Sequence, residues 1–105
     1  MRFTVSQPAL SEALATVMKG VASASTLPIR ATDGVLEFQT SNYTISIRHR
    51  IAARVEEEGE MVVPCKMLSN ITKTLPDAPV SFEVAERQVS IACEKSSFRL
   101  NTLDA

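Results

Sequence analysis

The sequence has few of the residues that usually carry out catalysis or hold metals. Among its 105 residues are one histidine, two cysteines, three glycines and no tryptophan. No glycine-rich phosphate loop, nucleophile motif or group of metal ligands accompanies the histidine, His49, which lies between Arg48 and Arg50. A structural role for His49 on a half-buried strand is therefore favoured over a functional one. We therefore expect no catalysis, no metal site and no cofactor.

Long apolar runs and an excess of charge are also missing. No run approaches the roughly 20 residues needed to cross a membrane, and the first residues lack the apolar core of a signal peptide. Cys65 and Cys93 are spaced neither as a disulfide framework nor as a metal site. These features predict a cytoplasmic protein without membrane contact. The net charge of −1 argues against binding nucleic acid by overall charge, so any basic patch must be local.

The first residues with a clear periodicity predict a strand and then a helix. Residues 2–5 alternate polar and apolar side chains, as a short strand does, and Ser6 can cap the helix that follows. Apolar residues then recur at helical spacing: Leu10, Ala13, Leu14, Val17 and Val21. Gly20 is expected to end this helix, because glycine accepts the left-handed conformation common just past a helix end. The small, polar residues 20–28 are expected to form a loop.

Two strand patterns and an acidic run follow. Asp33-Gly34 predicts a tight turn, with a strand over 35–39 after it. Residues 43–55 form one long strand pattern, with mostly apolar side chains on one face and arginines on the other. The run from Glu56 to Glu60 is expected to be a solvated turn rather than a metal site. This turn is the best internal boundary in the chain.

The second half of the chain repeats the order of the first. A strand over 61–63 precedes a helix that Pro64 opens, and three strands are expected over 80–84, 88–93 and 97–100. The predicted apolar stripe of this second helix consists of Met67, Leu68, Ile71 and Leu75.

This order predicts a single domain, residues 1–105, made of two pseudo-repeats of about 1–55 and 60–103. The second repeat is β-α-β-β-β, whereas the first is expected to be one strand short. Two amphipathic helices and about seven strands imply an α+β fold. Both helices are expected to pack on one face of a mostly antiparallel sheet.

The solvent face of the second helix is the most informative part of the sequence. Lys66 and Lys73 are seven residues apart and fall on one side of the helix, together with Ser69 and Asn70. On the first helix, Lys19 also points away from the apolar stripe. Lysines ordinarily solvate the backs of helices, but such a face could instead meet phosphates without reading bases. The pattern alone leaves both interpretations open.

The last predicted strand presents a second choice. Phe98 and Leu100 share one face of it, and the basic residue Lys95 comes just before them. The two apolar residues either complete the core, which the pattern favours, or lie at an edge where another subunit pairs.

Several fragments resemble bacterial sliding-clamp sequences. They are Met1-Arg2-Phe3-Thr4-Val5, Thr26-Leu27-Pro28-Ile29, Ala31-Thr32-Asp33-Gly34-Val35-Leu36, Val63-Pro64, Leu75-Pro76 and Phe98-Arg99-Leu100-Asn101-Thr102-Leu103. Their order and spacing match over nearly the whole chain. The sequence therefore resembles the first of the three domains of the bacterial DNA polymerase III beta subunit, the beta sliding clamp.

The resemblance implies a homodimeric ring that encircles duplex DNA without reading its sequence and confers processivity on the polymerase. In this family helices line the pore, and sheets form the outside and the contacts between subunits. Lys66 and Lys73 match basic residues on a pore helix, whereas Lys19 is placed in the pore by its helical face alone. The polymerase and the clamp loader are expected to bind through later domains that this chain does not contain.

The resemblance also assigns the last strand. Phe98 and Leu100 match an apolar pair at the subunit interface, where the first domain meets the third domain of the partner. Lys95 matches a basic residue that pairs there with acidic groups. Between Ile29 and Arg30 relatives carry a further segment that forms a strand, which agrees with the strand expected to be missing. The alternative function is a freestanding protein-interaction domain that uses a sheet edge and does not bind DNA.

Overall fold

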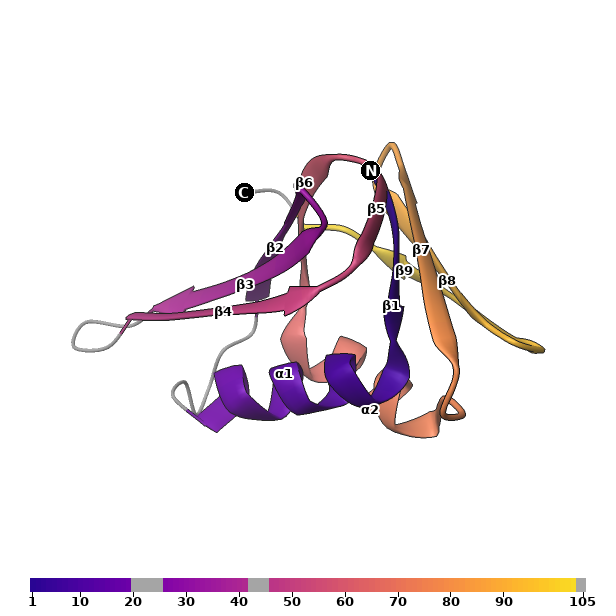
Figure 1. The fold of residues 1–105 in the computed structure, drawn as a ribbon, viewed down its shortest axis with the longest axis horizontal. Helices are drawn as coiled ribbons and strands as arrows, with labels where there is room; N and C mark the ends of the chain where they lie inside the picture. Colours follow the sequence, from indigo (N-terminus) through magenta and orange to yellow (C-terminus); the bar gives the residue numbers. More distant parts are fainter. Residues whose placement is uncertain (20–25, 42–45, 104–105) are drawn as a thin grey trace.

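The computed structural model describes residues 1–19, 26–41 and 46–103, which form two helices and nine strands (Figure 1). The helices are α1 (Gln7–Lys19) and α2 (Cys65–Thr74). The strands are β1 (Arg2–Ser6), β2 (Thr26–Thr32), β3 (Val35–Ser41), β4 (Ser46–Ala52), β5 (Arg54–Glu57), β6 (Gly59–Pro64), β7 (Pro79–Ala85), β8 (Gln88–Cys93) and β9 (Ser96–Asn101). Neither α1 nor α2 is long and apolar enough to cross a membrane.

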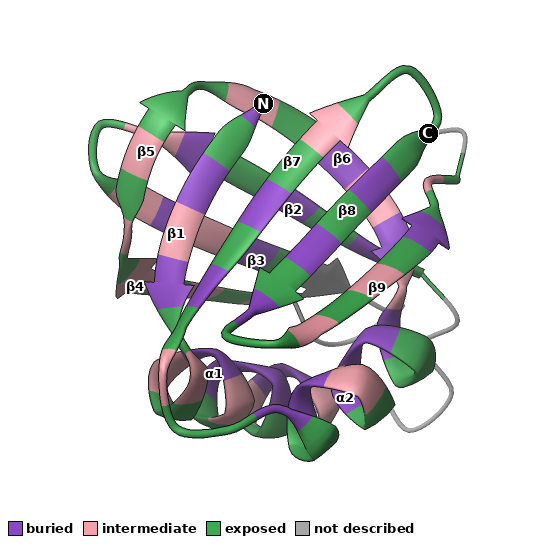
Figure 2. Ribbon diagram, turned by 90° about the vertical axis from the view of Figure 1, so that its right-hand side faces the viewer, coloured by how far each residue is buried: buried purple, intermediate pink, exposed green. Residues whose placement is uncertain are grey.

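The strands form two antiparallel sheets rather than the single sheet that was predicted. One sheet has the order β5-β1-β7-β8-β9, and the other has the order β4-β3-β2-β6. The sheets face each other, and both helices close the space between them at one end (Figures 1 and 2). The fold is therefore α+β as expected, and its core is enclosed by two sheets and by the pair of helices.

One bend explains why two sheets replace one. The pattern over 43–55 predicted a single strand, but the chain leaves β4 at Ala52 and starts β5 at Arg54. Between them the Ala53 N–H donates to the Gly34 carbonyl at 3.0 Å. Because β4 pairs with β3 and β5 pairs with β1, the bend carries the chain from one sheet to the other.

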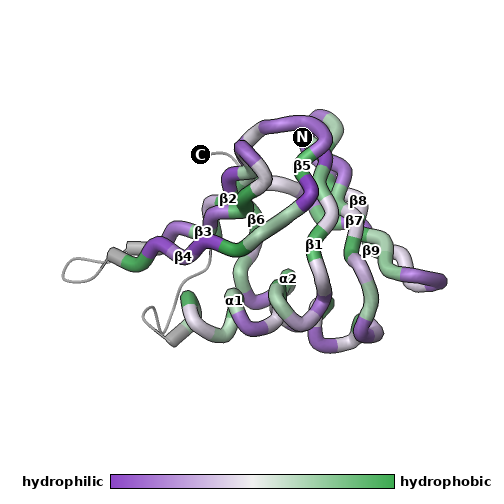
Figure 3. Tube along the Cα trace, in the orientation of Figure 1, coloured by the Kyte–Doolittle hydropathy of each residue, from purple (hydrophilic) through white to green (hydrophobic). Residues whose placement is uncertain are grey.

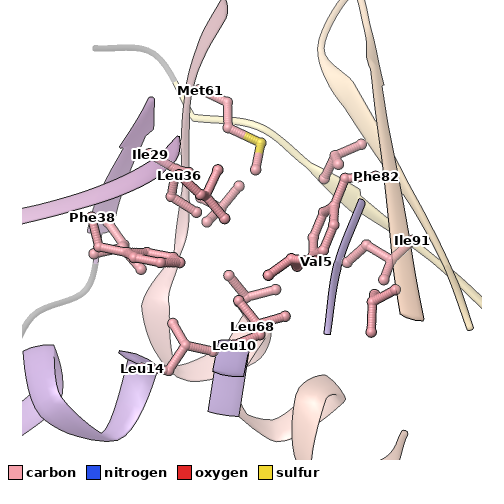
Figure 4. Close-up of a cluster of buried hydrophobic side chains, with 14 of the residues drawn as sticks. Val5, Leu10, Leu14, Ile29, Leu36, Phe38, Met61, Leu68, Phe82 and Ile91 are labelled. Carbon is pink, nitrogen blue, oxygen red and sulfur yellow. The ribbon is translucent and has the colours of Figure 1, made fainter. Parts of the chain in front are cut away.

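The core lies between the two sheets and the helices (Figure 4). Phe3 and Phe82 stack at its centre, with ring centroids 4.7 Å apart. The predicted stripe of α1 is confirmed over its described residues, all buried: Leu10, Ala13, Leu14 and Val17. The Ser6 hydroxyl accepts the Ala9 N–H at 3.3 Å, as expected of a helix cap. Val21 and Gly20 lie outside the described residues.

Strand β2 corrects two predictions made for the first half. Thr26 to Pro28 were expected in a loop, but they begin β2 and pair with β6. Pro28 lacks an N–H, which is tolerated because β2 pairs with β3 only from Ile29 onwards. The first half is therefore not one strand short, since β2, β3 and β4 all follow α1. Ile29 and Arg30, where a strand was expected to be missing, pair on both sides of β2.

The acidic run between the two halves is mostly strand, not the predicted turn. Glu56 and Glu57 belong to β5, and Glu60 belongs to β6. Glu57 accepts a hydrogen bond from the Met1 ammonium at 2.6 Å, which lowers the pKa of the carboxyl group. Glu58 accepts the Asp33 N–H at 3.0 Å, and this bond lowers its pKa as well. Among the described residues no cluster of side chains suited to holding a metal occurs.

Candidate functional site

Helix α2 buries most of the predicted stripe: Leu68 and Leu75 are buried and Ile71 is partly buried against the core, whereas Met67 is not. Its buried residues are Cys65, Leu68, Ser69 and Thr72, spaced as one helical stripe. Met67, predicted to be core, is instead 51% exposed, so the buried face is rotated towards the small residues. The buried Thr72 hydroxyl donates to the Leu68 carbonyl at 2.8 Å, so its burial leaves no polar group unpaired.

Helix α2 carries small buried side chains and is joined to α1 by a direct hydrogen bond. The Gln7 side-chain amide of α1 donates to the Thr72 carbonyl of α2 at 2.9 Å. A shallow groove of 230 Å³ runs between the two helices, and Lys73 lies on its border. The two helices therefore form one continuous layer below the sheets (Figure 2).

The outward face of this layer carries the two predicted lysines. Lys66, Asn70, Lys73 and Thr74 of α2 are all exposed, and α2 has no acidic residue. Among the described residues, no salt bridge involves Lys66 or Lys73. Ser69, predicted to share this face, is buried instead. The face is therefore cationic and polar, which suits contact with phosphates and offers no arrangement for reading bases.

The third predicted cation, Lys19, is the last residue of α1, and its side chain lies outside what the structure describes. Glu12 of the same helix is exposed. The structure thus brings together Lys66 and Lys73, and the position of the Lys19 side chain stays a prediction.

Strand β9 lies at the edge of the five-stranded sheet and pairs only with β8 in that sheet. Its two apolar residues differ: Leu100 is buried in the core, whereas Phe98 is only partly buried. Lys95 is exposed in the turn between β8 and β9. This turn is the hydrophilic, protruding end of the hairpin (Figure 3). An edge strand with a half-exposed phenylalanine can accept a further strand.

A cluster of charged residues on the outer face of the four-stranded sheet was not predicted. Glu37 of β3 accepts a hydrogen bond from the Arg50 Nε of β4 at 2.7 Å, and the Arg48 Nε lies 3.6 Å from its other oxygen. The bond from Arg50 is the main cause that lowers the pKa of Glu37. Only the cross-strand register places these residues side by side, and the sequence alone does not give this register.

Comparisons with known proteins agree on one family. The whole chain, residues 1–105, matches the family described as DNA polymerase III beta subunit, N-terminal domain. A beta sliding clamp homolog, GriR, of Streptomyces muensis is 35% identical over 98% of this chain. The beta sliding clamp of Bacillus subtilis is 33% identical over 100% of it.

Two solved structures have the same fold. The Helicobacter pylori beta clamp in complex with carprofen matches 99% of this chain at a TM-score of 0.90 and 25% identity. Caulobacter crescentus pol III beta matches 100% of it at a TM-score of 0.90 and 26% identity. The chain spans 29% and 32% of the two sequence relatives and 30% and 31% of the two solved chains. The similarity therefore concerns about a third of each of these proteins.

Proposed function

The chain belongs to the DNA polymerase III beta subunit family, whose N-terminal domain it matches, and from this premise we propose that it forms part of a sliding clamp. In this role it is one segment of a ring that encircles duplex DNA and keeps the polymerase on its template. The ring holds DNA by topology, and this domain contributes contacts rather than catalysis.

The outward face of α2 carries this proposal. Lys66 and Lys73 are exposed, unopposed by acidic residues on their helix, and accompanied by the polar Asn70 and Thr74. Exposed lysines attract phosphates over about 10 Å at moderate salt, and they do so at every position along the duplex. A surface of this kind favours retention and sliding over binding at one sequence. Lys19 extends it at the end of α1 in this proposal.

The edge strand β9 supports the second part of the proposal, ring closure. We assign Phe98 and Lys95 to direct contact with the next subunit, because Phe98 is half-exposed and Lys95 lies in the protruding turn. Leu100 takes an indirect part, because it is buried beneath the strand and fixes its position. A second copy of the full-length subunit is the proposed partner.

Other partners of the clamp lie outside this chain in the proposal. The Helicobacter pylori beta clamp has been solved bound to a DNA ligase peptide. We place the binding of polymerase, clamp loader and such peptides in further domains of the full-length subunit. The cytoplasm, where bacterial DNA is replicated, is the proposed compartment.

Charge reversal on α2 tests the pore assignment. In the full-length subunit, Lys66→Glu with Lys73→Glu is expected to shorten the residence of loaded clamps on circular DNA, because attraction to phosphates becomes repulsion. Each lysine removed lowers the salt dependence of DNA binding by about one unit of slope. Sedimentation should show an unchanged dimer.

The matched control is Arg54→Glu with Arg87→Glu, which makes the same change of charge at exposed positions away from the helices. It is expected to leave residence on DNA unchanged. Equal loss in the control, or unchanged residence of the lysine variant at low salt, refutes the pore assignment.

The open edge of β9 also favours a second candidate function, a freestanding interaction domain that adds a partner strand. Binding by such a domain would depend on β9 and not on Lys66 or Lys73. Persistence of all biological activity in the lysine variant, together with its loss when β9 is altered, would select this candidate.

A further inference from the structure

A groove of 610 Å³ is lined by residues of β2, β3 and β6, by the end of β7 and the turn after it, and by the two residues that follow β9. None of the described residues that line it belongs to α1 or α2. It runs along β6, the edge strand of the four-stranded sheet, and Thr102 and Leu103 border it. Its lining includes Pro28, Arg30, Glu60, Val62, Glu86 and Leu103. Its volume is within the range of small-ligand and peptide-anchor sites, roughly 300–1,000 Å³.

Among the described residues, β6 pairs with β2 on one side and is bound by Leu103 on the other, so the wall of the groove offers backbone groups of an edge strand. The Val62 carbonyl of β6 points away from β2 and accepts the Leu103 N–H at 2.7 Å. Because backbone groups alternate sides along a strand, those of Glu60 point to the same side as those of Val62. An extended peptide could therefore hydrogen-bond to the edge of β6 at Glu60, two residues before the carbonyl that the Leu103 N–H already uses.

The groove combines an apolar floor with an acidic rim. Pro28, Val62 and Leu103 supply apolar surface. The Leu103 side chain is 38% exposed, so part of it is free to contact a ligand. Glu60 and Glu86 are exposed at the rim. Arg30 is the one basic residue in the lining, and it already lies 3.4 Å from Glu60.

The remaining acidic residue of the lining, Glu37, adds no free negative charge to the groove. Its carboxylate is bound by Arg50 and Arg48 on the far side of the groove. Within the described residues, Glu86 takes part in no salt bridge. Because Arg30 pairs with Glu60 and two arginines pair with Glu37, the negative charge that favours a basic partner is that of Glu86.

We propose that this groove binds an extended segment of a partner protein in which an apolar side chain is flanked by Lys or Arg. The apolar side chain lies on Val62 and Leu103, the partner backbone pairs with the edge of β6, and the basic side chains reach Glu60 and Glu86. This is strand addition with charge complementarity at its rim. The inference is independent of the pore assignment, because it uses no residue of the helical layer.

The probe is a synthetic peptide in which leucine and lysine alternate, compared with a peptide in which glutamate replaces each lysine. Titration of the isotope-labelled chain, followed by amide chemical shifts, gives both the affinity and the location. The lysine peptide is expected to shift the amides of Glu60, Val62, Glu86 and Leu103. The glutamate peptide is expected to shift none of them.

Two variants separate charge from apolar contact. Glu60→Lys with Glu86→Lys should weaken the lysine peptide roughly tenfold, because two rim contacts become repulsive. Leu103→Ser should weaken binding of the lysine peptide about fivefold, because part of the apolar contact surface is removed. Glu12→Lys with Asp77→Lys makes the same change of charge at exposed sites outside the groove and should leave the affinity unchanged. Circular dichroism confirms that each variant is folded.

Four outcomes overturn the proposal. Equal weakening in the Glu12 and Asp77 variant would show non-specific attraction to a cationic peptide. Shifts confined to α2 or β9, or equal binding of the glutamate peptide, would place the site elsewhere. Concentration-dependent shifts of groove amides without peptide, with a dimer in sedimentation that Leu103→Ser abolishes, would assign the groove to a second copy of this chain.

Discussion

The two helices occupy equivalent places in the fold and contribute to it in different ways. Helix α1 buries large apolar side chains, among them Leu10, Leu14 and Val17. Helix α2 buries one large side chain, Leu68, and otherwise small residues, while Met67 and its lysines remain outside. Apolar area removed from water provides most of the favourable free energy of folding. The stability of the helical layer therefore resides mainly in α1, and its outward charge resides in α2.

This division explains how a surface can serve a ligand without weakening the fold. Changes to the exposed side of α2 leave the core intact, because Lys66, Asn70 and Lys73 lie outside it. Changes to the buried face of α1 act on the whole molecule. The predictions below test this contrast, beginning with the largest expected effect.

The strongest test of the contrast is Leu14→Ala in α1. Leu14 is 1% exposed, so truncation should lower the free energy of unfolding by about 2–5 kcal/mol through lost burial and a residual cavity. Urea denaturation followed by circular dichroism measures the change. A loss below about 1 kcal/mol, the size typical of a surface change, would show that α1 is not the main anchor of the helical layer.

Strand β9 offers the same contrast between a buried and an outward residue. Leu100→Ala should lower the free energy of unfolding of the isolated chain by about 2 kcal/mol, because Leu100 is 4% exposed. Phe98→Ala should cost the isolated chain less, and in the full-length subunit it should weaken the dimer, because half-exposed aromatic residues anchor interfaces. Denaturation of the chain and sedimentation of the subunit measure the two effects. If Phe98→Ala unfolds the chain and leaves the dissociation constant of the dimer unchanged, Phe98 is a core residue and its interface assignment fails.

The contrast between the helices also shows what the sequence could predict. The stripe of α1 was predicted correctly, because it is made of large apolar residues at helical spacing. The stripe of α2 was predicted correctly at Leu68, Leu75 and partly Ile71, but wrongly at Met67. Hydropathy placed Met67 inside and Ser69 outside. Close packing against α1 favours small side chains, and this preference depends on a neighbour distant in sequence. The exposure of Lys66 and Lys73 was still predicted correctly, since both positions lie outside either stripe.

The errors in the sheets have a related cause. The start of β2 looked like a loop because residues 20–28 are small and polar. Pro28 in addition lacks the N–H that a sheet ladder uses. It is accommodated only because β3 does not reach that far along β2, which no local pattern reveals. The division into two sheets depends on a bend at Ala53, and the edge position of β9 depends on strand order. Both are properties of pairing between residues far apart in the chain.

The bond between the helices provides a prediction of intermediate size. Gln7→Ala removes the donor to the Thr72 carbonyl and should lower the free energy of unfolding by about 0.5–1.5 kcal/mol. The low end is expected, because the Leu75 N–H also donates to this carbonyl, at 3.2 Å, and leaves it paired. Gln7→Glu is the matched variant, since it keeps the shape and loses the donor. Denaturation midpoints equal to that of the unaltered chain in both variants would show that the bond does not couple the helices.

The smallest expected effect is that of Met67→Ala, and it separates the observed buried face of α2 from the predicted one. Because Met67 is 51% exposed, its truncation leaves no cavity and should change the free energy of unfolding by no more than about 0.5 kcal/mol. Alanine is also a strong helix former, which offsets part of any lost contact. Leu68→Ala in the same helix is the comparison, and it should cost about 2–5 kcal/mol in the same urea experiment. If Met67→Ala proves as costly as Leu68→Ala, α2 is rotated towards the predicted stripe. Lys66 and Lys73 lie outside either stripe, so the pore assignment would stand, and only the rotation of α2 about its axis would be revised.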